Sequence, residues 1–155
     1  MARQLEEILS DVPFLEGMGP ERLALLAGCA SNVHFDPGQV VFREGDRADA
    51  FYIVRHGTVG VELHAPPRSP MMVETIEAGE VLGWSWLFPP YRTHFDARAL
   101  SNVRATSFDG ACLRAKCEAD PNLGYDLMKR FAQVFSERLQ WTRLRLLDIY
   151  GDRVT

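Results

Sequence analysis

The chain has 155 residues, 46% hydrophobic and 25% charged, a composition typical of one folded domain with its own core. Its 17 basic and 21 acidic side chains give a formal net charge of −4, which disfavours nucleic-acid binding. No apolar run approaches the roughly 20 residues of a membrane-spanning helix, and the acidic, amphipathic start does not have the pattern of a signal peptide. We therefore expect a cytoplasmic domain that binds neither nucleic acid nor membrane.

Residues 3–30 have the apolar spacing of helices. Pro13 and the pair Gly19-Pro20 interrupt this region, and Pro20 suits the first position of a second helix, where its missing N–H costs nothing. The apolar positions that share helical faces are Leu5, Ile8 and Leu9, followed by Leu23, Leu25, Leu26 and Ala30. We expect these N-terminal helices to pack on the region that follows.

Residues 33–109 change to short β-rich runs separated by turn signals such as Asp36-Pro37-Gly38 and Glu44-Gly45-Asp46. The runs lie at 39–42, 50–54, 58–63, 71–76, 94–100 and 104–109. Many short strands at regular spacing favour an antiparallel sandwich or roll. We predict an α+β fold in which an antiparallel β-roll of the double-stranded jelly-roll type is flanked by N-terminal helices and a long C-terminal helix, all within one domain spanning 1–155.

The C-terminal region, 111–150, is predicted to be helical, with a short helix over 111–118 and a long one that starts at Asp120-Pro121. A heptad stripe runs along the long helix through Met128, Ala132, Phe135, Leu139, Thr142, Leu146 and Ile149, and a second stripe holds Leu127, Phe131 and Val134. We interpret the first half as packing on the roll and the second half as pairing with another copy. The alternative is that both stripes cover the chain's own core.

The chain has 3 cysteines, Cys29, Cys112 and Cys117, an odd number in a domain large enough to fold without disulfides. We expect buried or inert thiols in a reducing cytoplasm. The histidines His34, His56, His64 and His94 are scattered without paired spacing, and no nucleophile elbow or Walker-type glycine loop is present. The sequence therefore predicts neither a metal site nor an enzyme.

The segment from Gly79 to Ala99, GEVLGWSWLFPPYRTHFDARA, combines a glycine-rich turn, a brief apolar stretch, a proline pair and Arg92 beside Thr93. Glycine lets the backbone approach a ligand closely, a helix start presents free N–H groups, and arginine offers a two-pronged donor to phosphate. Inside a β-roll this combination indicates a phosphate cradle.

The order of these regions resembles the cyclic nucleotide-binding domain of the catabolite activator (Crp/Fnr-like) family over residues 12 to 150. FDPGQVVFREGDRADAFYIVRHGTVGVEL is similar to the first half of that roll, and GEVLGW…LF followed by YRT is similar to its phosphate-binding cassette. LQWTRLRLLDIYGD resembles the end of its dimer helix. The resemblance implies an eight-stranded roll, a cyclic nucleotide whose phosphate lies on the cassette, and a structural role for the turn glycine Gly57.

The same resemblance places Gly83, Arg92 and Thr93 at the cassette glycine, the phosphate arginine and its hydroxyl neighbour. Trp84 stands where the family has a glutamate that holds the ribose hydroxyl, a loss of about 1–3 kcal/mol in binding. The segment after Arg92 is one residue longer than the family pattern, so His94 is the alternative to Thr93 in the hydroxyl slot. The family's DNA-binding helix-turn-helix would follow the long helix, and we expect none in this chain.

The predicted ligand-binding residues are Gly83, Trp84, Ser85, Arg92, Thr93 and His94. The leading hypothesis is a non-enzymatic regulatory domain that binds a cyclic nucleotide, such as cAMP or cGMP, or a related phosphorylated ligand, and signals through a homodimer helix. One alternative is a degenerate domain whose pocket a tryptophan blocks and which acts as a dimeric interaction module for an unknown protein partner. Another is a different, non-nucleotide ligand, since tryptophan suits flat rings. No cofactor is expected.

Overall fold

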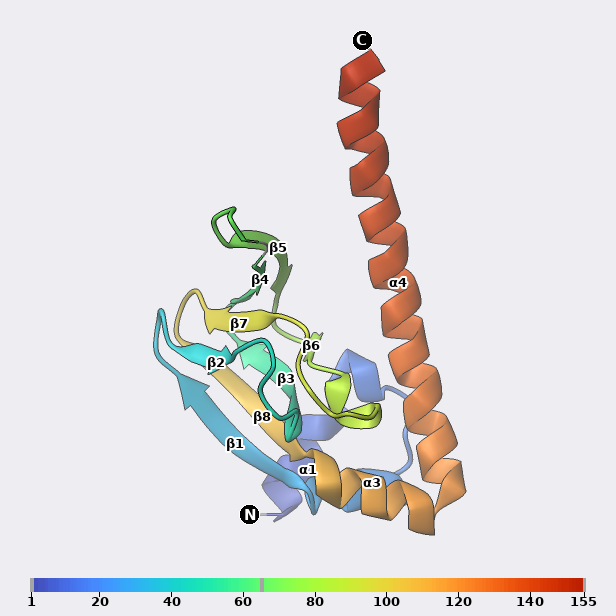
Figure 1. Ribbon diagram of the computed structural model, residues 1–155. Helices are drawn as coiled ribbons and strands as arrows, with labels where there is room; N and C mark the ends of the chain where they lie inside the picture. The colour runs from blue at the N-terminus through green and yellow to red at the C-terminus, as the bar shows by residue number, and fades with distance from the viewer. Residues whose placement is uncertain (1, 65, 155) are drawn as a thin grey trace.

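The structure, a computed structural model, describes residues 2–64 and 66–154, and side chains within 5–64 and 66–149. Two four-stranded antiparallel sheets form a roll, with helices gathered at one end and a long helix along its side (Figure 1). The elements are α1 (Ala2–Ser10), η1 (Pro13–Leu15), α2 (Pro20–Ala27), β1 (Ala30–Phe35), β2 (Val40–Phe42), β3 (Ala50–His56), β4 (Val59–Leu63), β5 (Met71–Ile76), β6 (Val81–Leu82), η2 (Ser85–Leu87), β7 (Asp96–Ala99), β8 (Val103–Asp109), α3 (Gly110–Ala119) and α4 (Pro121–Val154). The predicted fold class is confirmed.

The interior of the roll lies between the sheets β1-β8-β3-β6 and β2-β7-β4-β5. Alternate residues of a strand point to opposite faces, so Val59 and Val61 of β4 turn inward together. The buried cluster contributed by both sheets consists of Val54, Val59, Val61, Ile76, Leu82, Ala97, Ala99, Val103 and Ala105. These small and branched side chains fill the space between the two sheets.

A second, aromatic core joins the roll to the helices. The ring of Phe51 on β3 stacks on Phe108 of β8, with centroids 4.5 Å apart, and meets Phe131 of α4 edge-on at 5.2 Å. Leu9, Leu15 and Leu26 from the N-terminal helices belong to the same buried cluster. Since α4 contributes Leu123, Leu127 and Phe131, its first half is part of the domain core.

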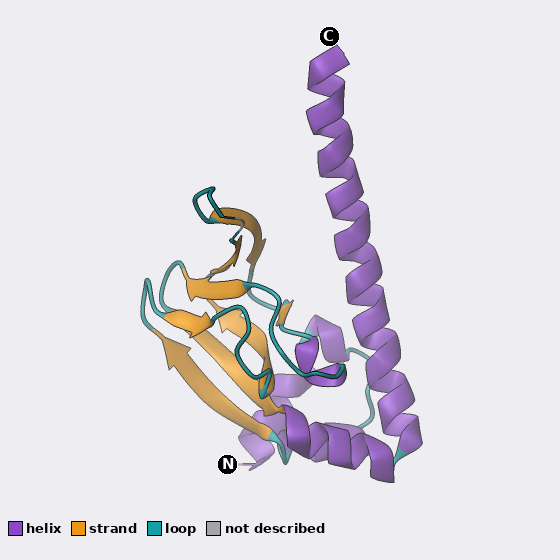
Figure 2. Ribbon diagram, viewed as in Figure 1, coloured by secondary structure: helices purple, strands orange, loops and turns teal. Residues whose placement is uncertain are grey.

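The second half of α4 differs from the first. Figure 2 shows this part of the helix extending beyond the strands of the roll. Its exposed apolar side chains are Leu139, Trp141, Leu144, Leu146, Leu147 and Ile149. The predicted packing of the first half is therefore confirmed, whereas pairing of the second half with another copy stays a prediction.

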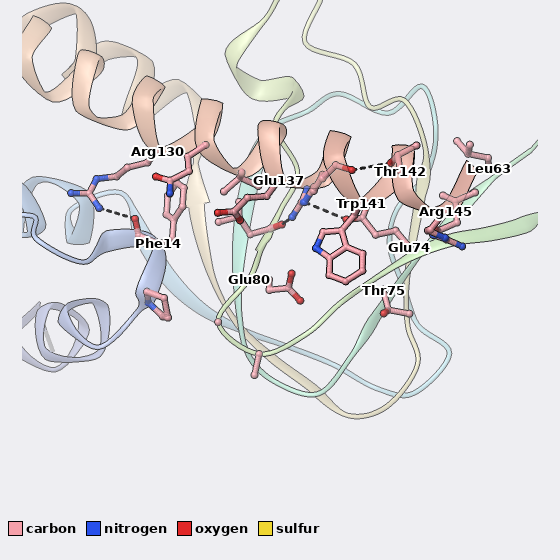
Figure 3. A pocket seen from close by; sticks show the side chains of 18 of the residues that line it. Phe14, Leu63, Glu74, Thr75, Glu80, Arg130, Glu137, Trp141, Thr142 and Arg145 are labelled. Atoms are coloured by element: carbon pink, nitrogen blue, oxygen red, sulfur yellow. Dashed lines mark hydrogen bonds and ion pairs between the residues drawn. The ribbon is translucent and has the colours of Figure 1, made fainter. Parts of the chain in front are cut away.

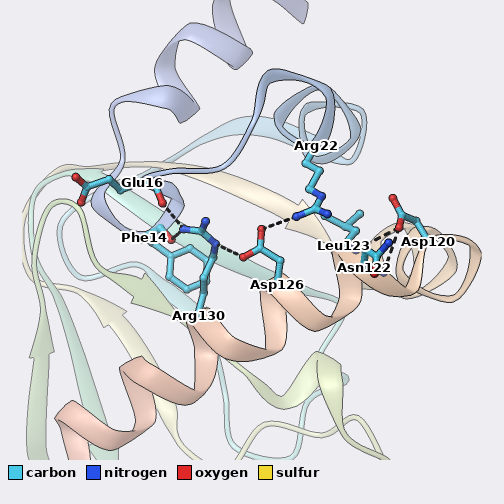
Figure 4. Close-up of polar contacts among 8 residues, drawn as sticks. All are labelled: Phe14, Glu16, Arg22, Asp120, Asn122, Leu123, Asp126 and Arg130. Atoms are coloured by element: carbon cyan, nitrogen blue, oxygen red, sulfur yellow. Dashed lines mark hydrogen bonds and ion pairs between the residues drawn. The ribbon is translucent and has the colours of Figure 1, made fainter.

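Arg130 fixes the first half of α4 against the N-terminal segment (Figure 4). One guanidinium nitrogen donates to the carbonyls of Phe14 and Glu16, each at 2.8 Å, and Nε pairs with Asp126 at 2.9 Å. The other oxygen of Asp126 accepts from Arg22 of α2 at 3.3 Å. Because hydrogen bonds to charged groups stabilise more than neutral ones, this network reinforces the apolar contact between α4 and the N-terminal helices.

Two strands are not among the predicted runs. β1 has the polar sequence ASNVHF, in which only Val33 and Phe35 are partly buried against the roll core, so its alternation is weak. β6 has two residues, too few for a pattern, and pairs with β3 through Tyr52 and Ile53. Both are defined by strand pairing rather than by their own sequence.

Gly57, in the turn between β3 and β4, has the structural role that the resemblance implies. Its φ is +90°, a left-handed conformation that favours glycine. A Cβ at this position would lie 2.1 Å from the carbonyl oxygen of Asn102, which excludes any side chain. The two neighbouring turns of the roll can therefore approach each other closely.

The expectation of three free thiols is wrong for two of the cysteines. Cys29, just before β1, and Cys112, in the first turn of α3, form a disulfide across a sequence separation of 83 residues. Cys117 is free, and burial, followed by the charge of Asp120, raises the pKa of its thiol. Disulfides are uncommon in a reducing cytoplasm, so this bond weighs against the predicted cytoplasmic location, which stays a prediction.

Candidate functional site

The predicted phosphate-binding segment, Gly79 to Ala99, includes β6 and turns sharply just after that strand. Gly83 has a φ of +91° and turns the chain out of the strand toward η2. A Cβ there would lie 3.6 Å from the carbonyl oxygen of Ala50, an ordinary contact, so the backbone angle rather than the available space calls for glycine. Ser85 follows as the first residue of η2 and is buried. The segment thus has the tight turn that the sequence predicts.

The side chain of Trp84 packs between His94, near the end of the predicted phosphate-binding segment, and the long helix α4. Its indole stacks on the ring of His94 with centroids 5.2 Å apart and planes 19° apart. It also meets Phe88 edge-on at 6.5 Å and Phe135 of α4 at 5.9 Å. Trp84 is therefore a packed contact that joins Phe88 and His94 to Phe135 of α4.

Trp86 belongs to the aromatic core and not to a ligand pocket. Its side chain is 0% exposed, stacks on Phe51 at 5.3 Å and meets Phe131 at 5.8 Å. Within the described residues its indole N–H has no hydrogen-bond partner. Arg114 of α3 donates to the Trp86 carbonyl at 2.6 Å, so this part of the cassette is tied to the helical end of the roll.

Thr93 has a structural role, because its polar groups form hydrogen bonds within the domain. Its side chain is buried, and its hydroxyl donates to the carbonyl of Arg43 in the turn between β2 and β3. Its amide donates to the carbonyl of Asp46 at 2.9 Å, and its carbonyl accepts from the amide of Gly45 at 2.9 Å. The hydroxyl therefore fastens the segment before β7 to the turn Arg43–Asp46.

Arg92 and His94, on either side of Thr93, are both exposed. Arg92 forms an isolated antiparallel bridge with Arg47, and its Nη1 donates to the carbonyl of Gly45 at 3.4 Å. The remaining N–H groups of this guanidinium form no further contact among those described. Of the predicted site residues, Trp84 and His94 are in direct contact, while Arg92 lies against the turn that contains Gly45.

A large groove that the sequence did not predict lies between α4 and the edge of the roll (Figure 3). Its volume is about 1150 Å³, and β5, β6 and η1 form the wall that faces α4. Its lining residues include Glu74, Glu80, Glu137, Arg138, Trp141 and Arg145. None of the six predicted ligand residues lines it, so the predicted site and this groove are different places.

Arg138 and Arg145 of the groove already form hydrogen bonds or ion pairs within the chain. Arg138 pairs with Glu74 at 3.2 Å and donates to the carbonyl of Val81. Arg145 donates to the carbonyl of Val73. Trp141 is 68% exposed, and its indole points into the groove in Figure 3. The spacing of Arg138, Trp141 and Arg145 along one helical face is the sequence signal that could have indicated this groove.

The described domain is a two-sheeted β-roll closed by helices, with a glycine turn and an exposed arginine between β6 and β7. The family model described as "Cyclic nucleotide-binding domain" matches residues 32–120, which is more than half of the 155 residues. The chain belongs to this family. Within residues 2–64 and 66–154, no helix has an apolar stretch long enough to cross a membrane.

The similar proteins include regulators and larger enzymes. A CRP-like cAMP-activated global transcriptional regulator of Mycobacterium tuberculosis is 28% identical over 145 residues, which cover 94% of this chain and 63% of the regulator. Glutaminase 1 of Bradyrhizobium diazoefficiens is 28% identical over 133 residues, 84% of this chain but 21% of the glutaminase. The chain thus spans less than two thirds of these relatives, and the family occurs both in regulators and in proteins named as enzymes.

Two solved structures match nearly along their own full length. A putative cyclic nucleotide-binding protein from Geobacter metallireducens has a TM-score of 0.78 and 29% identity, covering 86% of this chain and 97% of that one. The N-terminal domain of a transcriptional regulator from Streptomyces coelicolor has a TM-score of 0.68 and 25% identity, covering 90% and 95%. The described fold is therefore that of whole, separately solved cyclic nucleotide-binding-type domains.

Proposed function

We propose that this chain is a non-enzymatic regulatory domain that binds a cyclic nucleotide, or a related phosphorylated small molecule, at the segment Gly83–His94. The observation that carries the proposal is Arg92, an exposed guanidinium with one long hydrogen bond of 3.4 Å beside a glycine-turn cassette. Its free donors suit a phosphate, which arginine binds through two parallel hydrogen bonds. Gly83 supplies the turn that leads into Ser85 and η2, and Thr93 holds the segment in place.

In this proposal Trp84 couples the ligand site to α4. The indole contacts His94 at one end of the cassette and Phe135 on the helix, so a ligand that moves His94 also changes the packing under α4. A ligand shifts such an equilibrium only by its difference in affinity for the two arrangements. The output would pass through the exposed apolar second half of α4, which we propose pairs with a second copy of the chain.

The alternative, an interaction module without a ligand, is favoured by the same tryptophan. Trp84 is half-buried among aromatic rings and occupies the place of the family's ribose-binding glutamate. A packed indole there removes both the hydrogen-bond acceptor and the space for a sugar. In that case the partner would be another protein, and the domain would act through its surface and α4.

The experiment that tests the proposal is a calorimetric titration of wild type and Arg92→Ala with cAMP and cGMP. We expect the variant to bind about 10-fold or more weakly, since hydrogen bonds to charged groups contribute about 1.5–3 kcal/mol. Arg55→Ala is the matched control, because Arg55 of β3 is also exposed and makes one long bond, at 3.3 Å to Asn32 of β1, on the same sheet. Equal affinity of wild type and Arg92→Ala would exclude Arg92 as the phosphate ligand.

A further inference from the structure

Three side chains with metal-binding atoms meet on the outer face of the sheet β2-β7-β4-β5. Glu62 of β4 and Asp96 of β7 are partners in the strand register. Their neighbours Val61 and Ala97 point into the roll core, so the two carboxylates face outward. His64 follows Glu62 by two residues, and one ligand atom from each of Glu62, His64 and Asp96 lies within 4.8 Å of the others.

Asp96 is the fixed member of this cluster. Its side chain is buried at 7% exposure, and its Oδ1 accepts a hydrogen bond from the amide of Glu44 at 2.7 Å. The other oxygen, Oδ2, lies 2.6 Å from Nε2 of His64. Burial alone raises the pKa of Asp96, but the Glu44 amide, the contact with His64 and the charge of Arg43 outweigh it and lower the pKa overall. Asp96 is therefore a carboxylate at neutral pH.

The donor set selects a class of ion. One imidazole nitrogen and two carboxylates suit first-row divalent ions such as Zn²⁺ or Mn²⁺, whereas Mg²⁺ and Ca²⁺ prefer oxygen ligands alone. The two carboxylates bring two negative charges, of which Arg98 offsets one from 3.4 Å beside Glu62. Tetrahedral ligands at about 2.0–2.2 Å from zinc are roughly 3.3–3.6 Å apart. Asp96 Oδ2 and His64 Nε2, which lie 2.6 Å apart, would therefore have to separate to admit the ion.

We propose that Glu62, His64 and Asp96 form a site for a divalent first-row transition metal ion, with water completing the coordination. The sequence analysis predicts no metal site because the histidines are scattered along the chain. The fold brings these ligands together although they are far apart in the sequence, because the β4–β7 register sets Asp96 beside Glu62, more than thirty positions earlier. His64 binds the ion through Nε2.

The place of the site in the fold gives the ion a structural role. Asp96 is anchored by the amide of Glu44, in the turn that also binds Thr93 and contacts Arg92. An ion on Asp96 would therefore hold this turn and the start of β7 in one position. The proposal stands apart from the proposed function, because the metal site and the segment Gly83–His94 share no residue.

The test uses the untagged full chain with its disulfide intact and with Cys117→Ser, which removes the free thiol. The protein is freed of metal with a chelator. It is then titrated calorimetrically with ZnCl₂, MnCl₂ and MgCl₂. We expect one Zn²⁺ per chain, weaker binding of Mg²⁺, and a higher thermal midpoint with zinc. Glu62→Gln and His64→Asn should each weaken zinc binding by about 10–100-fold, a loss typical of disturbing a metal site. Since His64 is exposed and Glu62 is half-buried, both variants should fold.

The matched control is His34→Asn, because among the described side chains His34 is the other histidine paired with a carboxylate, with Nδ1 3.7 Å from Asp36. This variant should bind zinc as the parent chain does. Binding of several ions with equal weakness, without one-to-one stoichiometry, would identify an adventitious ion only and overturn the proposal. Unchanged zinc affinity in His64→Asn, or its loss in His34→Asn, would overturn it as well.

Discussion

Phe131→Ala is expected to lower the free energy of unfolding by about 3–5 kcal/mol, the usual loss for deleting a fully buried phenyl ring. The ring is 1% exposed and touches aromatic rings from η1, β3 and η2, as well as Phe135 on its own helix. Its centroid lies 5.0 Å from Phe14, 5.2 Å from Phe51 and 5.8 Å from Trp86. The substitution therefore leaves a cavity where the roll, the N-terminal helices and α4 meet. Chemical denaturation followed by circular dichroism measures the loss.

Tyr125→Ala on the same helix is the control for Phe131→Ala. Tyr125 is 67% exposed, and the ammonium of Lys129 lies over its ring, so its removal should cost less than about 1 kcal/mol. If Phe131→Ala cost no more than Tyr125→Ala, the first half of α4 would not be part of the folded core. A coupling between the roll and α4 would then have no physical basis.

Trp84→Glu is expected to raise the affinity for a cyclic nucleotide by about 10–100-fold, because a carboxylate restores an acceptor worth about 1–3 kcal/mol. The smaller side chain also vacates the space between His94 and Phe135. Fluorescence anisotropy with a labelled cAMP analogue measures the change. The variant should also unfold at a lower temperature, since it loses the aromatic contacts of the indole.

Two further variants separate the effect of the new carboxylate from the effect of the vacated space and test whether its position matters. Trp84→Gln vacates similar space without the charge, so it should gain less affinity than Trp84→Glu. Trp141→Glu places the same new carboxylate on an exposed position of α4 and should leave the affinity unchanged. If Trp84→Glu bound no better than wild type, the tryptophan would not be what limits nucleotide binding.

The features that follow local rules could be predicted from the sequence. The stripe of Leu127 and Phe131 repeats at helical spacing, and both side chains are buried as expected. Strands β3, β4 and β5 have alternating or apolar runs bounded by glycine or proline turns, and Gly57 has the left-handed angle that its turn requires. In each case the signal lies within a few residues of the feature.

The features that depend on distant pairing could not be predicted in the same way. Cys29 reaches Cys112 because β1 pairs with β8, which leads directly into α3. Asp96 meets Glu62 and His64 through the β4–β7 register. The hydroxyl of Thr93, expected at a ligand, binds the carbonyl of Arg43 some fifty positions earlier in the chain. Residue types and spacing alone do not contain these partners.

The measurement that tests the account most directly is the thermal unfolding midpoint of the wild-type chain, alone and with millimolar cAMP, cGMP or cyclic dinucleotides. A ligand at 100 times its dissociation constant adds about 2.7 kcal/mol to stability, which corresponds to about 5–10 °C for a domain of this size. We predict such a rise with at least one of these ligands, and its loss in Arg92→Ala. An unchanged midpoint with every ligand would contradict the cyclic nucleotide sensor and leave the tryptophan-blocked interaction module, or a domain for a non-nucleotide ligand, as the better description.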